Sequence, residues 1–353
     1  EPMRAGKATG LAAAAALIFL PADAGAAQPH LDGAALGLGW ALPFAGILLS
    51  IALLPLLAPR FWHHHFGKVS LFWSLCVLLP MALLHGAGLT LYELLHAMLL
   101  EYLPFIILLL ALFTITGGIR IASSAAATPA FNTGLLAVGT ALASWTGTTG
   151  AAMVLIRPLL RANAWRQNRA HVVVFFIFLV ANIGGALTPL GDPPLFLGFL
   201  QGVPFFWPTT HLLLPMLTAS LLLLALFYPL DAWMMRRDAA VPPPAEPGRL
   251  RFEGGVNLVL LAGVVGAVLL SGTWKPGIGF AVHGIELGLQ GLVRDGLLLL
   301  LALASWILTP RPLRAANDFS WFPIVEVAKL FAGIFVTIVP VIAILQAGRD
   351  GVL

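Results

Sequence analysis

The stretch NIGGALTPLGDPPLFLGF, from Asn182 to Phe199, decides the fold of this chain. An apolar run that begins at His171 leads into it, and an apolar sequence resumes at Leu195. The glycines and prolines in between predict an interrupted helix, because both residue types are poor in a helix interior and proline lacks the amide donor. We therefore predict a membrane helix over residues 171–199 that is broken near the middle of the bilayer. Broken helices of this kind hold the substrates and ions of secondary transporters, where protein or water satisfies the free backbone groups.

Asp192 is the ionisable residue inside the predicted break. A carboxylate within a membrane is expensive to bury, so it is a functional candidate by default. It could bind a cation or exchange a proton, which would give the competition that an antiporter needs. Alternatively, it is a helix N-cap, since an acidic residue before Pro193 at the first helical position is a favoured arrangement. The two roles are compatible, and the start of the helix after Pro194 could also face an anion.

The composition predicts an all-α polytopic membrane protein. Of the 353 residues, 59% are hydrophobic and only 10% are charged, whereas a soluble domain carries about 25% charged residues. The net charge of +4 requires no nucleic-acid partner, because the basic residues lie in short loops between apolar runs, as the positive-inside rule predicts. The single cysteine, Cys76, lies in an apolar run, which excludes a disulfide framework and a cysteine metal site. The lipid bilayer is therefore the expected surrounding of most of the chain.

Residues 1–27 have the pattern of a signal peptide. Met3 is the expected start, Leu11–Leu20 is the apolar part, and Ala22–Ala27 contains small residues suited to cleavage. The alternative is a first membrane span, but the apolar part is short for a span, which needs about 20 residues. We expect a multi-pass membrane protein, and the resemblance given below implies the inner membrane of a bacterium.

Residues 132–160 are apolar but are interrupted by SWTGTTG, from Ser144 to Gly150. The segment is either a plain membrane span or a re-entrant hairpin whose tip lies at these small residues. Arg120 precedes the segment, and four arginines at positions 157–169 lie at its far end. Because basic residues prefer the cytoplasm, both ends are expected on the cytoplasmic side, which favours the hairpin.

A proline-rich polar linker over residues 236–253 is the expected boundary between two halves. We predict a first transmembrane half over residues 28–235, which contains the hairpin and the broken helix, and a partial second half over residues 254–353. A basic loop with three histidines is expected at residues 60–68. The apolar stretch 89–100 is expected to lie at the membrane interface.

The sequences SWTGTTGAAMVLIRP and NIGGALTPLGDPPLF together resemble the ion transporter superfamily. The most similar branch is that of the bacterial citrate transporters that are often described as sodium/proton antiporters. The resemblance covers Leu100–Leu230 well and the rest loosely. It implies an inverted-repeat transporter fold in which each repeat supplies a re-entrant hairpin and a broken helix, with cation and substrate held between them. By position it implies these binding residues: Thr146, Gly147, Thr148 and Thr149 at the tip, and Asn182, Gly184, Thr188, Pro189, Gly191 and Asp192 at the break.

The second half departs from the pattern of this superfamily. The run from Ile324 to Gly348 is similar to that from Tyr102 to Gly118, since each is apolar and ends in glycine. A hairpin segment follows the first run, whereas no hairpin or broken helix follows the second. We therefore expect a C-terminally truncated transporter whose second repeat is incomplete. Half of the paired site would then be missing, and this fragment would not transport by itself.

The residue types at the tip and the break suit a sodium ion. Sodium prefers oxygen ligands, which threonine hydroxyls and the carbonyls freed by a helix break supply. We predict Thr148, Asn182, Thr188 and Asp192 as its ligands, and no cofactor is expected besides this coupling ion. The alternative is that the small residues only let helices pack closely, as is common in membranes. A metal site at His63–His65 is not expected, because the tract lacks a spaced second set of ligands.

We predict a secondary active transporter, with sodium/proton antiport as the preferred function because Asp192 is titratable. The alternative is sodium- or proton-coupled symport of citrate or another carboxylate, and a channel or a non-transporting membrane scaffold ranks lower. An enzyme is not expected, because the apolar runs carry no His/Glu metal motif and no Ser/His pair at a useful spacing. The solute is therefore expected to be a small inorganic ion or a small carboxylate. A homodimer is the assembly to be tested.

Overall fold

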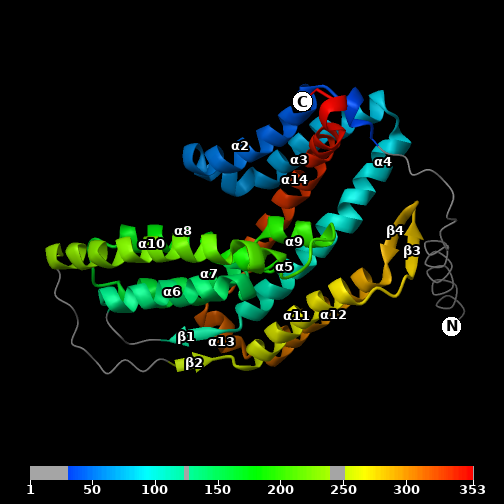
Figure 1. Cartoon of the computed structure of the whole chain (residues 1–353). Coiled ribbons are helices and arrows are strands. Elements are labelled where there is room, and N and C mark those ends of the chain that lie inside the picture. The colour runs from blue at the N-terminus through cyan, green and yellow to red at the C-terminus, as the bar shows by residue number, and fades with distance from the viewer. Residues whose placement is uncertain (1–30, 123–126, 239–250, 353) are drawn as a thin grey trace, which may run out of the picture. The chain divides into compact units, whose positions relative to one another are not determined.

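The computed structural model describes residues 31–122, 127–238 and 251–352 (Figure 1). The predicted signal peptide and part of the predicted linker lie outside these residues. Within them, eight helices are long and apolar enough to cross a membrane, which confirms the prediction of an all-α polytopic membrane protein. They are Leu38–Leu57, Pro59–Leu84, Ala87–Thr116, Ala170–Leu187, Trp207–Arg237, Val256–Thr273, Leu289–Leu308 and Phe322–Asp350.

The described chain divides into two compact units, each built from segments that are distant in sequence. Unit 1 combines the residues up to Ile106 with Lys275–Leu292 and Trp321–Leu353. Unit 2 consists of Ile107–Trp274 and Val293–Ser320. All of the predicted binding residues belong to unit 2.

In unit 1, α14 (Phe322–Ala347) packs against α2 (Leu42–Leu57) and α3 (Pro59–Leu84). Small residues bring α14 and α3 together. The hydroxyl of Ser70 donates to the backbone oxygen of Lys329 at 2.6 Å, and a Cβ on Gly333 would lie 2.2 Å from that hydroxyl. Close approach at small residues is the usual packing of membrane helices, because lipid supplies no hydrophobic driving force between them.

Two sequence predictions for unit 1 are wrong. Residues 60–68 are not a loop but the first turns of α3, so the basic and histidine residues there lie on a helix. The stretch 89–100 is not a separate interfacial segment, since α4 (Ala87–His96), the π-helix η3 (Ala97–Tyr102) and α5 (Leu103–Thr116) continue one another. The π-helix ends just before Pro104, whose missing amide removes a donor from the regular helical pattern.

Unit 2 is built around the segment that was predicted as a hairpin. Its arms are α6 (Pro129–Thr146) and α7 (Thr148–Ala162), which pack against each other and run in opposite directions (Figure 1). Entry and exit on one side of the membrane stays a prediction. The helices α8 (Ala170–Leu179) and α10 (Trp207–Arg237) pack against α6.

Apolar side chains hold this group of helices together. The buried cluster includes Leu136 of α6, Leu155 and Leu159 of α7, and Phe176 and Leu179 of α8, none more than 2% exposed. Full burial of such a side chain contributes about 1.5–3 kcal/mol relative to exposure. The arms and the helix that leads to the break are therefore packed as one body.

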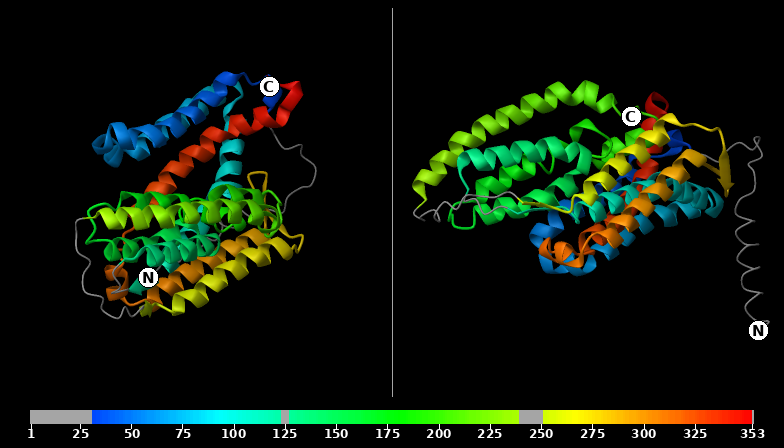
Figure 2. Two further views of the ribbon diagram at one scale, coloured as in Figure 1. Left: turned by 60° about the vertical axis from the view of Figure 1, so that its left-hand side comes forward. Right: turned by 90° about the horizontal axis from the view of Figure 1, so that it is seen from below.

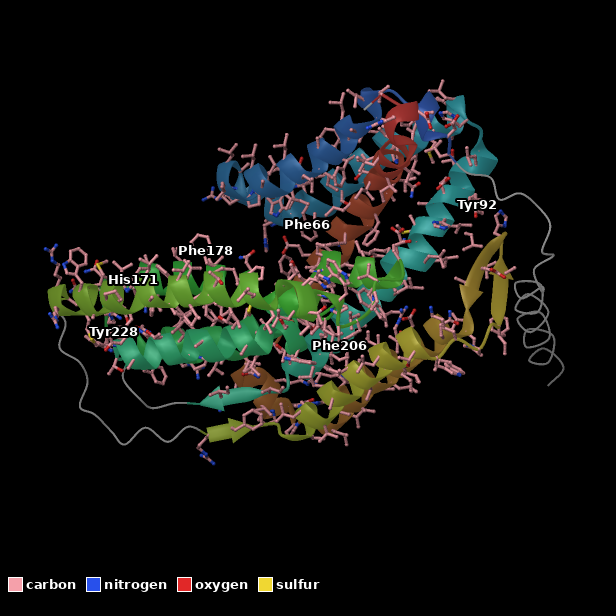
Figure 3. The ribbon with its side chains drawn as sticks, viewed as in Figure 1. Phe66, Tyr92, His171, Phe178, Phe206 and Tyr228 are labelled. Atoms are coloured by element: carbon pink, nitrogen blue, oxygen red, sulfur yellow. The ribbon has the colours of Figure 1, made fainter. Side chains whose placement is uncertain are left out.

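The outer surface of unit 2 is apolar as well. Figure 3 shows Phe178 and Tyr228 pointing away from the helix group, and they are 51% and 50% exposed. Apolar exposure of this extent suits contact with lipid. The helix α10, seen as a long curved helix in Figure 2, contains Pro215 and Pro229, and proline is a usual cause of helix bending.

The remaining helices of unit 2 pack around the end of α5. They are α11 (Val256–Thr273), most of α12 (Leu289–Leu308) and α13 (Arg311–Ala316). Arg314 is buried and donates to the backbone oxygens of Thr114 at 2.8 Å and Ser305 at 2.9 Å. Burial lowers the pKa of this guanidinium, but the group stays charged because the ordinary pKa of arginine is very high. A cation at a helix C-terminus is stabilised by the helix dipole.

Two short antiparallel sheets were not predicted. In unit 2, β1 (Arg120–Ala122) pairs with β2 (Arg251–Glu253), and Arg120 forms an ion pair with Glu253 at 3.1 Å. In unit 1, β3 (Gly279–Val282) pairs with β4 (Ile285–Gly288). The first sheet links the chain entering the hairpin to the end of the predicted linker.

Candidate functional site

The tip of the hairpin is a one-residue turn. Helix α6 ends at Thr146, α7 begins at Thr148, and Gly147 between them has a φ of +76°. Residues with a side chain rarely adopt this left-handed backbone conformation, so glycine is the residue that allows the arms to reverse direction at this point. A Cβ on Gly147 would also lie 3.3 Å from the backbone oxygen of Leu190, which belongs to the break.

The break replaces helical backbone over the residues that the sequence indicated. Helix α8 ends at Leu179, a 3-10 turn η4 spans Ile183–Leu187, and α9 spans Pro193–Leu200. Thr188 and Asp192 have extended backbone. The interruption follows from local chemistry, since glycines and prolines occupy the positions where the helical pattern stops.

Hydrogen bonds join the hairpin tip directly to the break. The amide of Thr148 donates to the backbone oxygen of Gly191 at 3.1 Å. The hydroxyl of Ser144 donates to the backbone oxygen of Gly184 at 2.5 Å and accepts from the amide of Leu187 at 3.1 Å. We refer to these contacts, together with those of Thr188 below, as the tip–break junction.

Thr188 completes the junction. Its hydroxyl donates to the backbone oxygen of Ser144 and accepts from the amide of Leu190 at 3.2 Å. The side chain is fully buried. The hydroxyl therefore uses its donor and one of its two lone pairs within the protein, and the burial of the side chain limits the access of a sodium ion to the other lone pair.

Three glycines allow the backbones of the junction to approach each other. A Cβ on Gly191 would lie 2.0 Å from the backbone oxygen of Gly185, and a Cβ on Gly184 would lie 2.7 Å from that of Thr140. Real Cβ atoms do not come this close to backbone atoms, so no larger residue fits at these two positions without movement of the chain. The glycines serve close packing here, which was the alternative interpretation of the small residues.

The predicted binding residues divide into a buried set and an accessible set. Six are buried within the junction, Thr148 is half-buried, and Thr149, Asn182 and Asp192 are exposed. The buried ones are Thr146, Gly147, Gly184, Thr188, Pro189 and Gly191. A ligand that approaches the junction would meet the accessible set first.

Asp192 and Thr149 are exposed side chains with oxygen atoms that adjoin the hydrogen bond between tip and break. Each is the next residue after one partner of the bond between Thr148 and Gly191. Asp192 occupies the N-cap position of α9, but its carboxylate makes no capping hydrogen bond. Its charge is therefore free to act on a ligand. The side chain of Asn182 instead donates to the backbone oxygen of Ile177 at 2.8 Å and turns back along α8.

The expectation that the start of α9 faces an anion is wrong. Pro193 and Pro194 open the helix and have no amide hydrogen. The next two amides, of Leu195 and Phe196, donate to the backbone oxygen of Asp192 at 3.1 and 3.3 Å. The first turn therefore has no free donors, and the negative group at this end is the carboxylate of Asp192.

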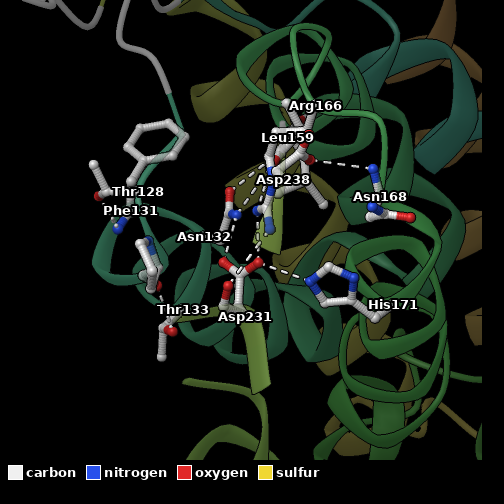
Figure 4. A network of polar contacts seen from close by, with 12 residues as sticks. Thr128, Phe131, Asn132, Thr133, Leu159, Arg166, Asn168, His171, Asp231 and Asp238 are labelled. Atoms are coloured by element: carbon white, nitrogen blue, oxygen red, sulfur yellow. Dashed lines mark hydrogen bonds and ion pairs between the residues drawn. The ribbon is translucent and has the colours of Figure 1, made fainter. Parts of the chain in front are cut away.

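Sequence reasoning missed two parts of this region. Ser144 lies within the quoted SWTGTTG stretch but was not chosen as a site residue, although it makes three of the junction's hydrogen bonds. Asp231 was not singled out either. Figure 4 shows its buried carboxylate bound by Asn132, Arg166 and His171. An acidic residue near the end of an apolar run was the available signal.

Among residues 31–122, 127–238 and 251–352, no group of three or more His, Cys, Asp or Glu side chains is placed to hold a metal ion. In the histidine tract, Nδ1 of His64 contacts the backbone oxygen of Arg60 at 2.9 Å, and Nδ1 of His65 contacts that of Phe61 at 3.1 Å. These rings bind their own helix.

Comparison with known proteins gives one match. The sequence model of a protein family described as "Putative citrate transport" matches residues 33–353. The search of curated proteins and the search of solved structures each found no match. The family match includes the hairpin, the break and every predicted binding residue.

Proposed function

The chain belongs to this citrate transport family, and from that premise we propose that it moves citrate or a similar small carboxylate together with a sodium ion or a proton. The membrane would be the inner membrane of a bacterium. The observation that carries the proposal is the free carboxylate of Asp192 beside the hydrogen bond between hairpin tip and break. The family match shifts the preference from sodium/proton antiport, which the sequence favoured, to carboxylate transport.

The charge of Asp192 supplies a reason for coupling. Two like charges about 4 Å apart repel by about 4 kcal/mol at the effective dielectric constant near a protein surface. A carboxylate substrate would therefore be repelled from this position unless a cation bound first. A sodium ion or a proton at Asp192 removes the repulsion, and a bound sodium ion also gives the anion a cation to approach. Binding of substrate would then depend on the cation, which is the requirement for symport.

The neutral oxygens proposed for a sodium ion belong to the hairpin tip, which the hydrogen bond between Thr148 and Gly191 joins to the residue before Asp192. The hydroxyl of Thr149 is accessible, and Thr148 lies between it and the tip glycine. Thr188 is less suitable in the described conformation, because its side chain is fully buried. Asn182 is exposed, but the bond from its amide nitrogen to the backbone oxygen of Ile177 turns the side chain back along α8. We therefore give Asp192 and Thr149 the main roles among the proposed ligands.

The decisive experiment is uptake of labelled citrate into liposomes that contain the purified full-length protein. Uptake should require an inward gradient of sodium ions or protons. Asp192→Asn should remove the dependence on the cation while leaving the protein inserted and folded. Cation-independent citrate uptake by the unchanged protein, or an unchanged cation dependence in Asp192→Asn, would overturn the proposal.

Sodium/proton exchange is the second candidate, because a single titratable carboxylate at the junction is what such exchange requires. The two functions differ in their need for citrate. Exchange would move protons in a sodium gradient without citrate, which a pH-sensitive dye inside the liposomes detects. Assembly as a homodimer stays a prediction.

A further inference from the structure

A cluster of polar side chains lies at the end of the hairpin that is opposite to its tip. Its centre is Asp231 of α10, which is fully buried. The carboxylate lies 2.6 Å from Nη1 of Arg166, 2.7 Å from Nε2 of His171 and 2.9 Å from Nδ2 of Asn132. Figure 4 shows the three side chains converging on this group. We call these residues, together with Asn163, the base cluster.

Asn132 and Asn163 close the base cluster between the two arms. Each donates from Nδ2 to Oδ1 of the other, at 3.1 and 2.8 Å. Arg166 also donates to Oδ1 of Asn163 at 3.1 Å. Asn132 lies in the first turn of α6, and Asn163 directly follows α7. The cluster therefore fixes the open ends of the hairpin arms relative to each other.

The same cluster fixes the hairpin relative to the broken helix. His171 lies in the first turn of α8, the helix that ends at the break, and Asp231 lies in the last turns of α10. One carboxylate thus connects α6, α8, α10 and the turn after α7. The hairpin and the broken helix are joined twice, at the base by this cluster and at the other end by the tip–break junction.

The charges in the base cluster balance without a further proton. Arg166 and Asp231 form an ion pair whose side chains are both fully buried. Nε2 of His171 contacts the same carboxylate at 2.7 Å. Fixed geometry is therefore the role that the contacts favour.

We propose that Asp231 is a positioning residue for the transport site, and this inference rests on the function proposed above. It acts through Asn132, Arg166 and His171 on the direction of the hairpin arms. That direction decides whether the tip meets the break. No contact of the cluster reaches the junction itself, so its effect on transport is indirect.

The length of the arm makes the position of the tip sensitive to the base. Ser144 lies 12 positions after Asn132, which corresponds to ~18 Å along a helix at about 1.5 Å per residue. A tilt of about 5° at the base would move the tip by ~1.6 Å. Hydrogen bonds weaken steeply over such a distance. The junction bonds of 2.5–3.1 Å would not survive it without rearrangement.

A simple stabilising role is the competing explanation. Buried ion pairs contribute little net stability, because desolvation offsets their attraction, and apolar replacements of similar volume are often tolerated. What apolar residues do not reproduce is the set of directional hydrogen bonds. A double variant with apolar residues at both positions therefore separates the two explanations.

The test compares Arg166→Met/Asp231→Leu with Asp318→Asn as the matched control. Asp318 also pairs with an arginine of the hairpin, Arg157 at 3.4 Å, but its side chain is 78% exposed. The first readout is hydrogen–deuterium exchange of tip and break peptides in detergent. We expect at least tenfold faster exchange at residues 183–192 in the double variant, no change in α11, and no change anywhere in the control.

The second readout is citrate uptake. The double variant should raise the KM at least tenfold with its thermal unfolding temperature unchanged, whereas Asp318→Asn should keep the KM. If the double variant does not fold, Asn132→Leu serves instead, because it removes only the bonds of arm α6 to the cluster. Wild-type exchange at residues 183–192 together with a wild-type KM in a folded variant would overturn the inference. If the unchanged protein moves no citrate, the proposed function fails. The hydrogen–deuterium exchange at residues 183–192 still tests whether the base cluster determines the position of the hairpin tip.

Discussion

Replacing Ser144 by alanine should open the tip–break junction. The substitution removes the hydroxyl that donates to Gly184 at 2.5 Å and accepts from Leu187 at 3.1 Å. The backbone oxygen of Ser144 remains available to Thr188. The change is therefore confined to two hydrogen bonds between the arm α6 and the 3-10 turn.

The size of the effect follows from these two bonds. Each contributes about 0.5–1.5 kcal/mol net, and a buried group that loses its partner adds a further penalty of about 1–3 kcal/mol. The Gly184 backbone is buried, whereas Leu187 is half-buried, so we expect the penalty in full for the first and in part for the second. At the low end of these ranges, the free energy of opening the junction should fall by about 3 kcal/mol, which corresponds to a roughly 100-fold change in the population of the open form.

Hydrogen–deuterium exchange of the peptide that contains Leu187 measures this population directly, because exchange of a protected amide requires opening. The matched control is Thr140→Val, which removes a buried hydroxyl of the same helix. That hydroxyl donates only to Leu136 within α6, at 2.7 Å. Equal exchange in Ser144→Ala and in the control would refute the assignment of Ser144 as the centre of the junction.

Three further predictions concern the break and the hairpin. Asp192→Asn should make citrate uptake independent of the cation gradient, and a retained gradient dependence would reduce Asp192 to a helix cap. Gly191→Ala should abolish transport and lower the yield of folded protein, because the new Cβ would lie 2.0 Å from the backbone oxygen of Gly185. A fully active Gly191→Ala protein would contradict the described packing. Ala130 and Ala164 are exposed, and each can be replaced by a single cysteine in a cysteine-free background. Both cysteines should react with a membrane-impermeant reagent from the same side of the membrane. Reaction from opposite sides would exclude the re-entrant hairpin.

The sequence sufficed to locate the break and the hairpin tip because both depend on local chemistry. Gly147 permits a reversal between two helices, and Pro193 and Pro194 prevent helical hydrogen bonds, whatever surrounds them. The presence of Asp192 within the break could likewise be recognised directly from the sequence. These features needed no knowledge of distant parts of the chain.

The contacts that organise the site depend on residues far apart in sequence, and they could not be predicted from the sequence alone. The hydrogen-bonded residues Ser144 and Gly184 are 40 positions apart in sequence, and Asn132 and Asp231 are 99 positions apart. Local polarity also misled, since the histidines at 63–65 suggested a loop where the helix α3 continues.

The long sequence separation within the tip–break junction has a consequence for biosynthesis. Ribosomes add about 5–20 residues per second, so the partner of Ser144, which lies 40 residues later, is made ~2–8 s after it. During that time the polar groups at the hairpin tip lack the protein partners that they have in the finished structure. Unpaired backbone groups are costly in the hydrocarbon core. The hairpin should therefore reach its final depth only when the broken helix arrives, and ribosome pausing between the two segments would prolong exposure of the nascent chain to membrane proteases.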